Sequence, residues 1–372
     1  MITPASEAEL SEAIRAAEGP LRIVGGGTRP IGTPVEGATL STDALTGIEL
    51  YEPGALTLVV KSGTPVAAVE AALEAEGQRL PFEPIDHRPL LGTKNVPTIG
   101  GIVATNASGP RRIAVGACRD FMLGVRFVDG RGTILKNGGR VMKNVTGYDL
   151  VKLMAGSYGT LGILTEVALK VLPDVDDAAT VTLSGLSDVD AVRAMSAALG
   201  SPFEVSGAAH DPEAGATYLR IEGFATSVAY RAGRISDLLA PFGTADVTHG
   251  KAATAETWAA IRDVTDFAGR DGDVWRLSVK PSDAPALVAR SGAEAVRYDW
   301  GGGLVWLLMP EGTDLRAKLG TFRGHATLIR ASDDTRRALP VFQPENPVVG
   351  RLSEGLRAKF DPRGILNPGV MG

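Results

Sequence analysis

Two glycine-rich segments contain most of the residues that could hold a ligand. They are residues 24–28 (VGGGT) and residues 98–109 (TIGGIVATNASG). Glycine lets the backbone approach a ligand closely, and successive backbone N–H groups bind anions. Each segment is entered from apolar sequence, so the pair predicts one long, oxygen-rich ligand held at both ends. A dinucleotide fits this description.

Two common nucleotide-binding patterns are excluded by the residues that follow these glycines. A Rossmann fingerprint needs G-x-G-x-x-G at the start of a helix, but Gly25 and Gly27 are followed by Pro30 in place of the third glycine. A P-loop needs Gly-Lys-Ser/Thr, which ends neither segment. For either segment alone, a surface turn remains the alternative.

Further motifs connect the chain to a known family. They are residues 109–112 (GPRR), 119–121 (RDF), 143–150 (KNVTGYDL), 156–167 (GSYGTLGILTEV) and 360–369 (FDPRGILNPG). In these motifs the chain resembles the FAD-binding proteins of the vanillyl-alcohol oxidase type, whose FAD domain is also called PCMH-type. Within that family it is most similar to the smaller FAD-binding subunit of bacterial glycolate oxidase. The resemblance covers residues 20–173 and the tail.

The resemblance implies which residues contact FAD. The backbone of Gly25, Gly26, Gly27 and Thr28 would bind the pyrophosphate, whereas Arg29 is interpreted as a solvated surface residue. The other implied cofactor-binding residues are Thr98, Gly100, Gly101, Ala104, Asn106, Ser108, Gly109, Gly162, Ile163 and Asn367. For each glycine alone, a turn with positive φ is the alternative. Relatives that tether FAD use a histidine near the first loop, and residues 22–34 contain none, so we expect non-covalent FAD.

The catalytic residues are not identified by any motif. Oxidation of a 2-hydroxy acid needs a base and a cation for the carboxylate. His87 and His325 are candidates to reach the flavin, with a surface or structural histidine as the alternative for each. Arg111 and Arg112 are candidates to bind a carboxylate or an acidic partner. The four histidines are too far apart to form the His-rich metal motif of related dehydrogenases, so no metal site is predicted.

Composition limits the other functional classes. The chain has 372 residues, a length typical of two or three domains, and a net charge of −5, which gives no case for binding nucleic acid or an anionic membrane. Its one cysteine, Cys118, suits a reducing cytoplasm. The N-terminus does not resemble a signal peptide and no apolar run approaches the length of a membrane helix. We expect any membrane contact to come through a partner.

The expected fold is α+β, with a two-part PCMH-type FAD-binding domain and a cap domain. The predicted boundaries are 1–173 for the FAD-binding domain, 174–344 for the cap and 345–372 for a tail that returns to the FAD domain. Alternating patterns predict βαββαβ over residues 178–248, and the same order over residues 274–330 after a helix near 254–267. Two such ferredoxin-like halves would form one wide antiparallel sheet with helices on one face.

Three functional hypotheses follow. The first is an FAD-bearing subunit of a glycolate oxidase or dehydrogenase, which passes electrons between a larger catalytic FAD subunit and an iron–sulfur subunit. The second is a self-sufficient flavoenzyme that oxidises a small 2-hydroxy acid. The third is a non-catalytic assembly subunit without FAD. Substrate-dependent reduction of flavin in the isolated chain separates the first two, and a colourless protein would indicate the third.

Overall fold

The chain packs as two compact units. The computed structural model describes residues 1–140 and 147–372. The first unit is Met1–Ser108, Ala117–Asp174 and Pro344–Gly372, and the second is Gly109–Gly116 and Val175–Gln343. The packing therefore groups Gly109–Gly116 with the second unit, although the sequence places this segment in the first domain. The expected domain boundaries stay a prediction, and residues 143–146 of the KNVTGYDL motif lie outside the described residues.

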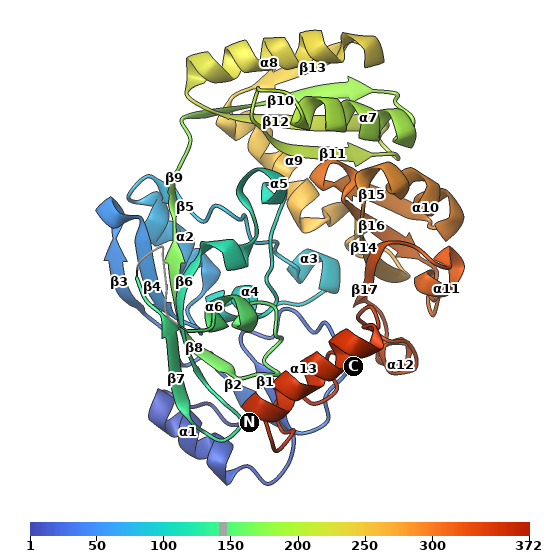
Figure 1. Cartoon of the computed structure of the whole chain (residues 1–372). Coiled ribbons are helices and arrows are strands. Elements are labelled where there is room, and N and C mark those ends of the chain that lie inside the picture. Colours follow the sequence, from blue (N-terminus) through green and yellow to red (C-terminus); the bar gives the residue numbers. More distant parts are fainter. Residues whose placement is uncertain (141–146) are drawn as a thin grey trace. The chain divides into compact units, whose positions relative to one another are not determined.

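An antiparallel five-stranded sheet forms the centre of the first unit, in the order β3-β4-β8-β6-β7 (Figure 1). Its strands are β3 (Ile48–Glu52), β4 (Thr57–Lys61), β6 (Met122–Val128), β7 (Ile134–Gly138) and β8 (Ile163–Lys170). β4, β8 and β6 form the interior of this sheet, and most residues of each are buried. The apolar patterns of residues 56–61, 124–127 and 163–170 each predict a strand from the sequence alone, and β4, β6 and β8 confirm them within two residues at each end.

A smaller layer of the first unit carries the first glycine-rich loop. β1 (Leu21–Val24) pairs in parallel with β2 (Ala38–Ser41), and the loop begins directly after β1. A core cluster joins this pair to α1 (Glu7–Ala16) and to the C-terminal tail. Within it, Leu21, Ile163 and Leu366 are each no more than 2% exposed. The loop is thus anchored by residues from three distant parts of the chain. The remaining elements of this unit are α2 (Val66–Glu74), β5 (Gln78–Arg79), α3 (Arg88–Leu91), α4 (Ile99–Ala104), α6 (Leu150–Met154), β9 (Leu172–Pro173) and α13 (Pro347–Phe360).

The second unit contains one eight-stranded antiparallel sheet in the order β13-β10-β12-β11-β15-β16-β14-β17. Its first half consists of β10 (Asp177–Ser184), α7 (Asp188–Leu199), β11 (Val205–Asp211), β12 (Ala216–Gly223), α8 (Ala225–Leu239) and β13 (Ala245–His249). The linking helix is α9 (Lys251–Asp263). The second half consists of β14 (Asp273–Val279), α10 (Ala284–Ser291), β15 (Ala295–Asp299), β16 (Leu304–Met309), α11 (Leu315–Leu319) and β17 (Gly324–Arg330). α5 (Arg112–Val115) and α12 (Asp333–Ala338) complete this unit.

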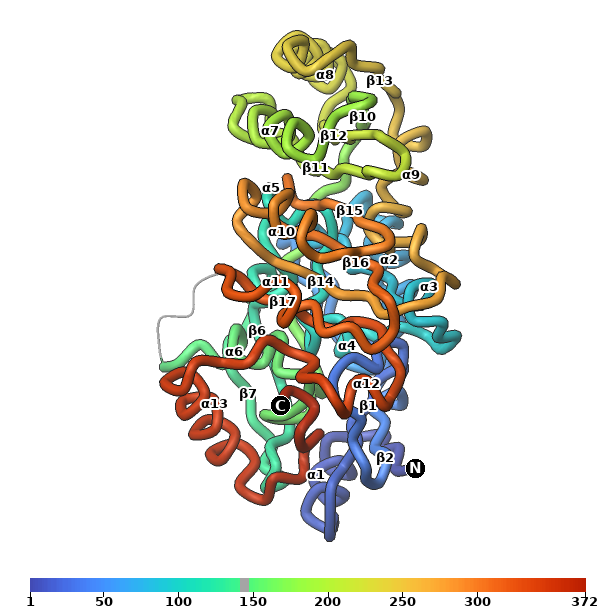
Figure 2. Tube along the Cα trace, turned by 90° about the vertical axis from the view of Figure 1, so that its right-hand side faces the viewer, coloured from blue at the N-terminus to red at the C-terminus, as the bar shows by residue number. Residues whose placement is uncertain are grey.

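This sheet confirms the predicted pair of ferredoxin-like halves. Each half repeats the strand order 4-1-3-2 of the βαββαβ unit, and the halves join where β11 meets β15. Figure 2 shows α7, α8, α10 and α11 on one side of the sheet and α9 on the other. α7, α8, α10 and α11 share one face because each βαβ connection returns the chain on the same side. The linking helix α9 packs on the opposite face, against β10 and β13 of the first half.

Candidate functional site

The first glycine loop provides a group of unused hydrogen-bond donors. Among the residues that the structure describes, the backbone N–H groups of Gly25, Gly26, Gly27 and Thr28 donate no hydrogen bond. Unpaired backbone donors are rare unless a ligand or water satisfies them, and successive donors of this kind bind phosphates. The loop therefore fits the pyrophosphate of FAD.

The second glycine-rich segment packs directly against this loop. A Cβ atom placed on Gly26 would lie 1.6 Å from the carbonyl oxygen of Val96, and one on Gly25 would lie 2.5 Å from Thr98 Oγ1. Only glycine allows this approach, because these separations are far shorter than van der Waals contact. The structure thus brings together the two loops that the sequence singled out.

The expectation that the second segment offers free backbone N–H groups is corrected by helix α4. Thr98 caps the helix by accepting a hydrogen bond from Gly101 N, while Gly100 N donates to Ser62 O at 2.7 Å. A Cβ on Gly100 would meet Ser62 at 2.7 Å. Gly100 therefore serves the packing of α4, whereas Gly101 faces the Arg29 guanidinium, with 3.6 Å between its Cβ position and Nη1.

Arg29 is a functional candidate that the sequence interpretation placed wrongly. Its side chain turns inward: Nε donates to His87 Nδ1 at 3.1 Å and Nη2 donates to Ile85 O at 3.0 Å. Burial lowers the pKa of Arg29 to about 10, so it stays charged at neutral pH. His87 is 4% exposed and serves as the partner that orients this cation. The sequence feature that could have indicated a functional role for Arg29 is its position directly after the glycine loop.

The last residue of α4 and the residues that follow the helix are held by local hydrogen bonds. Ala104 O accepts from Tyr158 N at 2.9 Å. Asn106, at φ +48°, accepts from Arg119 N, and Ser108 Oγ accepts from Cys118 N, both at 3.0 Å. Gly109 belongs to the second unit, where its carbonyl accepts from Trp300 Nε1 at 3.0 Å. These contacts fix the path of the chain, and the FAD contacts implied for these four residues remain predictions.

The last three predicted residues, Gly162, Ile163 and Asn367, make packing and hydrogen-bond contacts within the first unit. A Cβ on Gly162 would lie 2.6 Å from Phe127 Cδ2, and the Ile163 side chain is 1% exposed in the core. Asn367 joins β1 to the loop around Tyr158, since Oδ1 accepts from Ile23 N at 2.7 Å and Nδ2 donates to Tyr158 O at 2.8 Å. Any contact of Gly162 or Ile163 with FAD is therefore limited to the backbone.

The arginine pair proposed as a carboxylate site is separated by its contacts in the second unit. Arg111 is 5% exposed and forms a bidentate ion pair with Glu222, in which Nε lies 2.8 Å from Oε2. Arg112 instead packs over the Trp300 ring, 4.9 Å from its centroid. Because Glu222 already neutralises Arg111, Arg111 is not the substrate cation.

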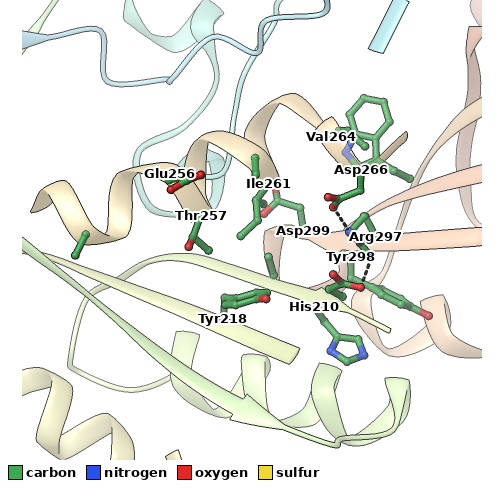
Figure 3. A pocket seen from close by; sticks show the side chains of 15 residues that line it. His210, Tyr218, Glu256, Thr257, Ile261, Val264, Asp266, Arg297, Tyr298 and Asp299 are labelled. Atoms are coloured by element: carbon green, nitrogen blue, oxygen red, sulfur yellow. Dashed lines mark hydrogen bonds and ion pairs between the residues drawn. The ribbon is translucent and has the colours of Figure 1, made fainter. Parts of the chain in front are cut away.

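A pocket of about 320 Å³ lies between α9 and the sheet of the second unit, and none of the predicted cofactor residues lines it (Figure 3). Its only arginine, Arg297, is paired with Asp211 and with Asp266, the latter at 2.7 Å. Glu256 and Asp299 add further carboxylates to the lining. The pocket therefore has no spare positive charge for an acidic ligand.

The described part of the chain contains neither a cluster of metal-binding side chains nor a helix suited to span a membrane. No group of three or more histidine, cysteine, aspartate or glutamate side chains could hold a metal ion there. Within the same residues, none of the helices has the length and apolar character needed to cross a bilayer.

Comparisons with known proteins agree with the geometry. A family model described as an FAD binding domain matches residues 1–138. The glycolate oxidase subunit GlcE of Escherichia coli strain K12 is 37% identical over 358 residues, which cover 95% of this chain and 92% of that protein. The glycolate oxidase subunit GlcD of Bacillus subtilis strain 168 is 36% identical over 118 residues, 32% of this chain and 24% of that protein.

Solved structures share the fold over the whole chain. A 4-ethylphenol oxidase from Gulosibacter chungangensis matches with a TM-score of 0.72, covering 100% of this chain and 88% of that one. Only 13% of the aligned residues are identical, so this similarity shows the architecture alone.

Proposed function

Because the chain belongs to the family of FAD-binding glycolate oxidase subunits, we propose that it is the FAD-bearing subunit of a multi-subunit enzyme that oxidises glycolate to glyoxylate. The observation that carries this proposal is the similarity to GlcE along nearly the full length of both chains. The chain is thus an FAD-dependent oxidoreductase by family, and glycolate is the substrate that the name of this relative supports.

The first unit holds FAD without a covalent bond in this proposal. The free N–H groups of Gly25–Thr28 and the charge of Arg29 offset the negative charge of the pyrophosphate. When bound, FAD supplies the acceptor for the two electrons that leave the hydroxyl-bearing carbon. Cys118 does not tether the flavin, because the thiol is fully buried and burial raises its pKa.

Electrons leave this subunit for a partner protein. An iron–sulfur cluster takes several cysteine ligands, and the chain has only Cys118. In this proposal the complex contains an iron–sulfur subunit, whose cluster ligands this chain does not supply, and a larger catalytic FAD subunit. It would work in the cytoplasm, with any membrane contact made through those partners.

Co-purification from the native organism tests the assignment. A tagged chain should carry with it a second flavoprotein and an iron–sulfur protein, and deletion of its gene should abolish glycolate-dependent dye reduction in extracts. If the chain purifies alone and its own flavin is reduced by glycolate at the rate of the extract activity, the self-sufficient enzyme is the correct assignment. A colourless chain in an active complex would indicate an assembly subunit instead.

A further inference from the structure

A row of side chains crosses the second half of the sheet in the second unit. Arg276 on β14 pairs with Trp306 on β16 and with Thr327 on β17, and Trp306 pairs with Arg297 on β15. Directly paired residues of antiparallel strands present their side chains on the same face. The neighbouring Trp275 points to the other face, where Arg316 packs over its ring. Arg276 therefore lies on the face opposite α10 and α11.

The two arginines of this row have opposite electrostatic surroundings. Arg297 is held by Asp211 and Asp266. Arg276 is half-buried, and it makes no hydrogen bond or ion pair with any residue that the structure describes. Within the described residues the guanidinium nitrogens of Arg276 are not buried, so their planar donors are open to a ligand and match a carboxylate. Arg276 is therefore the arginine of this row that can take an anionic ligand.

His325 lies beside Arg276 on the same face. His325 pairs with Ser278, two residues along β14 from Arg276, which makes the imidazole a diagonal neighbour of the guanidinium. Partial burial, Arg276 and Arg112 together lower the pKa of His325, so the ring is neutral at pH 7. A neutral imidazole has one donor and one acceptor nitrogen, and neither makes a hydrogen bond within the described residues.

We propose that Arg276 binds the carboxylate of a small 2-hydroxy acid and that His325 hydrogen-bonds its hydroxyl group. The inference rests on the proposed function for the reaction that the ligand undergoes. The match of a cation to a carboxylate and of a neutral imidazole to a hydroxyl group does not depend on that function. One cation suits a monoanion, and an adjacent neutral donor–acceptor group suits an uncharged hydroxyl. In 2-hydroxy acids these two groups are on adjacent carbons, so neighbouring side chains can bind both.

Trp306 lies between the two arginines and forms one edge of the proposed site. Its side chain is 4% exposed and separates Arg276 from the acid-paired Arg297. The carboxylates that satisfy Arg297 therefore do not compete for Arg276. The same face of the sheet can therefore carry one neutralised arginine, Arg297, and one available arginine, Arg276.

Calorimetric titration of the FAD-loaded chain tests both contacts with four probes: glycolate, acetate, glycolamide and inorganic phosphate. We expect Arg276→Gln to weaken glycolate binding by about 10- to 100-fold and to remove the preference for glycolate over uncharged glycolamide. His325→Gln should weaken glycolate by about 5- to 10-fold and remove the preference over acetate, which lacks the hydroxyl. Arg290→Gln, which removes an exposed charge from α10 on the other face, should leave all four affinities unchanged.

Three results would overturn the inference. They are wild-type glycolate affinity in Arg276→Gln, phosphate binding as tight as glycolate binding, and no glycolate binding by the wild-type chain. If Arg276→Gln does not fold, Arg276→Lys serves, with an intermediate loss expected because lysine keeps the charge but not the planar pair of donors. Co-purification decides the subunit assignment separately, so the failure of either claim can be recognised.

Discussion

At the scale of single residues, the proposed FAD binding depends on what Gly25–Thr28 and Arg29 do together. The loop leaves four backbone donors unused, and Arg29 adds a positive charge that His87 and Ile85 orient. Each feature alone has a structural explanation, such as a turn or an inward-packed arginine. Their coincidence in one place, in a chain that matches an FAD-binding family, supports the proposal that they bind the cofactor.

Gly26→Ala should remove FAD from the protein. The new methyl group would overlap Val96 O, so the loop would move away from the 95–98 segment and the four donors would no longer converge. The flavin-to-protein absorbance ratio of the purified variant measures the loss. Gly233→Ala is the control, since α8 has open space at this position. It should keep full flavin content and gain about 0.5–1 kcal/mol of stability from helix propensity. Full flavin in Gly26→Ala would contradict the assignment of this loop.

Arg29→Gln should weaken FAD binding about tenfold, because it removes a charge next to the proposed pyrophosphate site. Fluorescence titration of the deflavinated variant with FAD measures the affinity. Arg22→Gln is the matched control, since this exposed arginine lies on the neighbouring strand and only contacts Thr39. Equal losses in both variants would mean that overall charge, and not the position of Arg29, determines affinity.

At the scale of elements, one ion pair connects helix α1 to the main sheet of the first unit. Arg126 on β6 donates to Glu7 on α1 at 2.9 Å, and Thr165 on β8 donates to the same carboxylate. The Arg126 hydrogen bond, helped by Thr165, keeps the pKa of Glu7 below its usual value despite partial burial. This contact positions the layer from which the first glycine loop begins.

Glu7→Gln should therefore destabilise the protein by about 1 kcal/mol at pH 7. A carboxylate with a depressed pKa stabilises the fold above its unfolded pKa and loses that contribution as pH falls through the folded value. The difference in unfolding free energy between wild type and variant should thus begin to shrink as pH falls below the unfolded pKa, about 4.3, and continue to shrink through the lower folded pKa. Urea unfolding at pH 7 and pH 3.5 measures both values, with Glu12→Gln, an exposed change on the same helix, as control. A difference as large at pH 3.5 as at pH 7 would rule out the charged contact as its cause.

Regular elements could be predicted from the sequence because their signals are local. Alternation and helical periodicity are contained in each segment, so the two ferredoxin-like halves follow from residues 178–330 alone. The glycine-rich segment at 98–109 could not be predicted in the same way. Its glycines indicate an open loop, but the Thr98 cap and the close packing of Gly100 on Ser62 form a short helix. The inward position of Arg29 likewise depends on His87, which is distant in sequence.

At the scale of the whole molecule, the flavin should be exchangeable. No histidine occurs in residues 22–34, and burial raises the pKa of the Cys118 thiol, which disfavours the thiolate. Acid precipitation should therefore release all of the yellow colour into the supernatant. Colour retained in the washed pellet would show a covalent link and contradict the proposed mode of binding.

Because the flavin is expected to be exchangeable, its part in carrying electrons from glycolate can be measured directly. The deflavinated chain is reloaded with an FAD analogue whose absorption band is separate from that of FAD, returned to its complex, and mixed anaerobically with glycolate in a rapid-scanning spectrophotometer. We expect the analogue band to bleach within the time of one turnover, because this subunit is proposed to carry electrons from the hydroxy acid. An analogue band that stays oxidised while the complex turns over would show that the flavin of this chain lies outside the electron path.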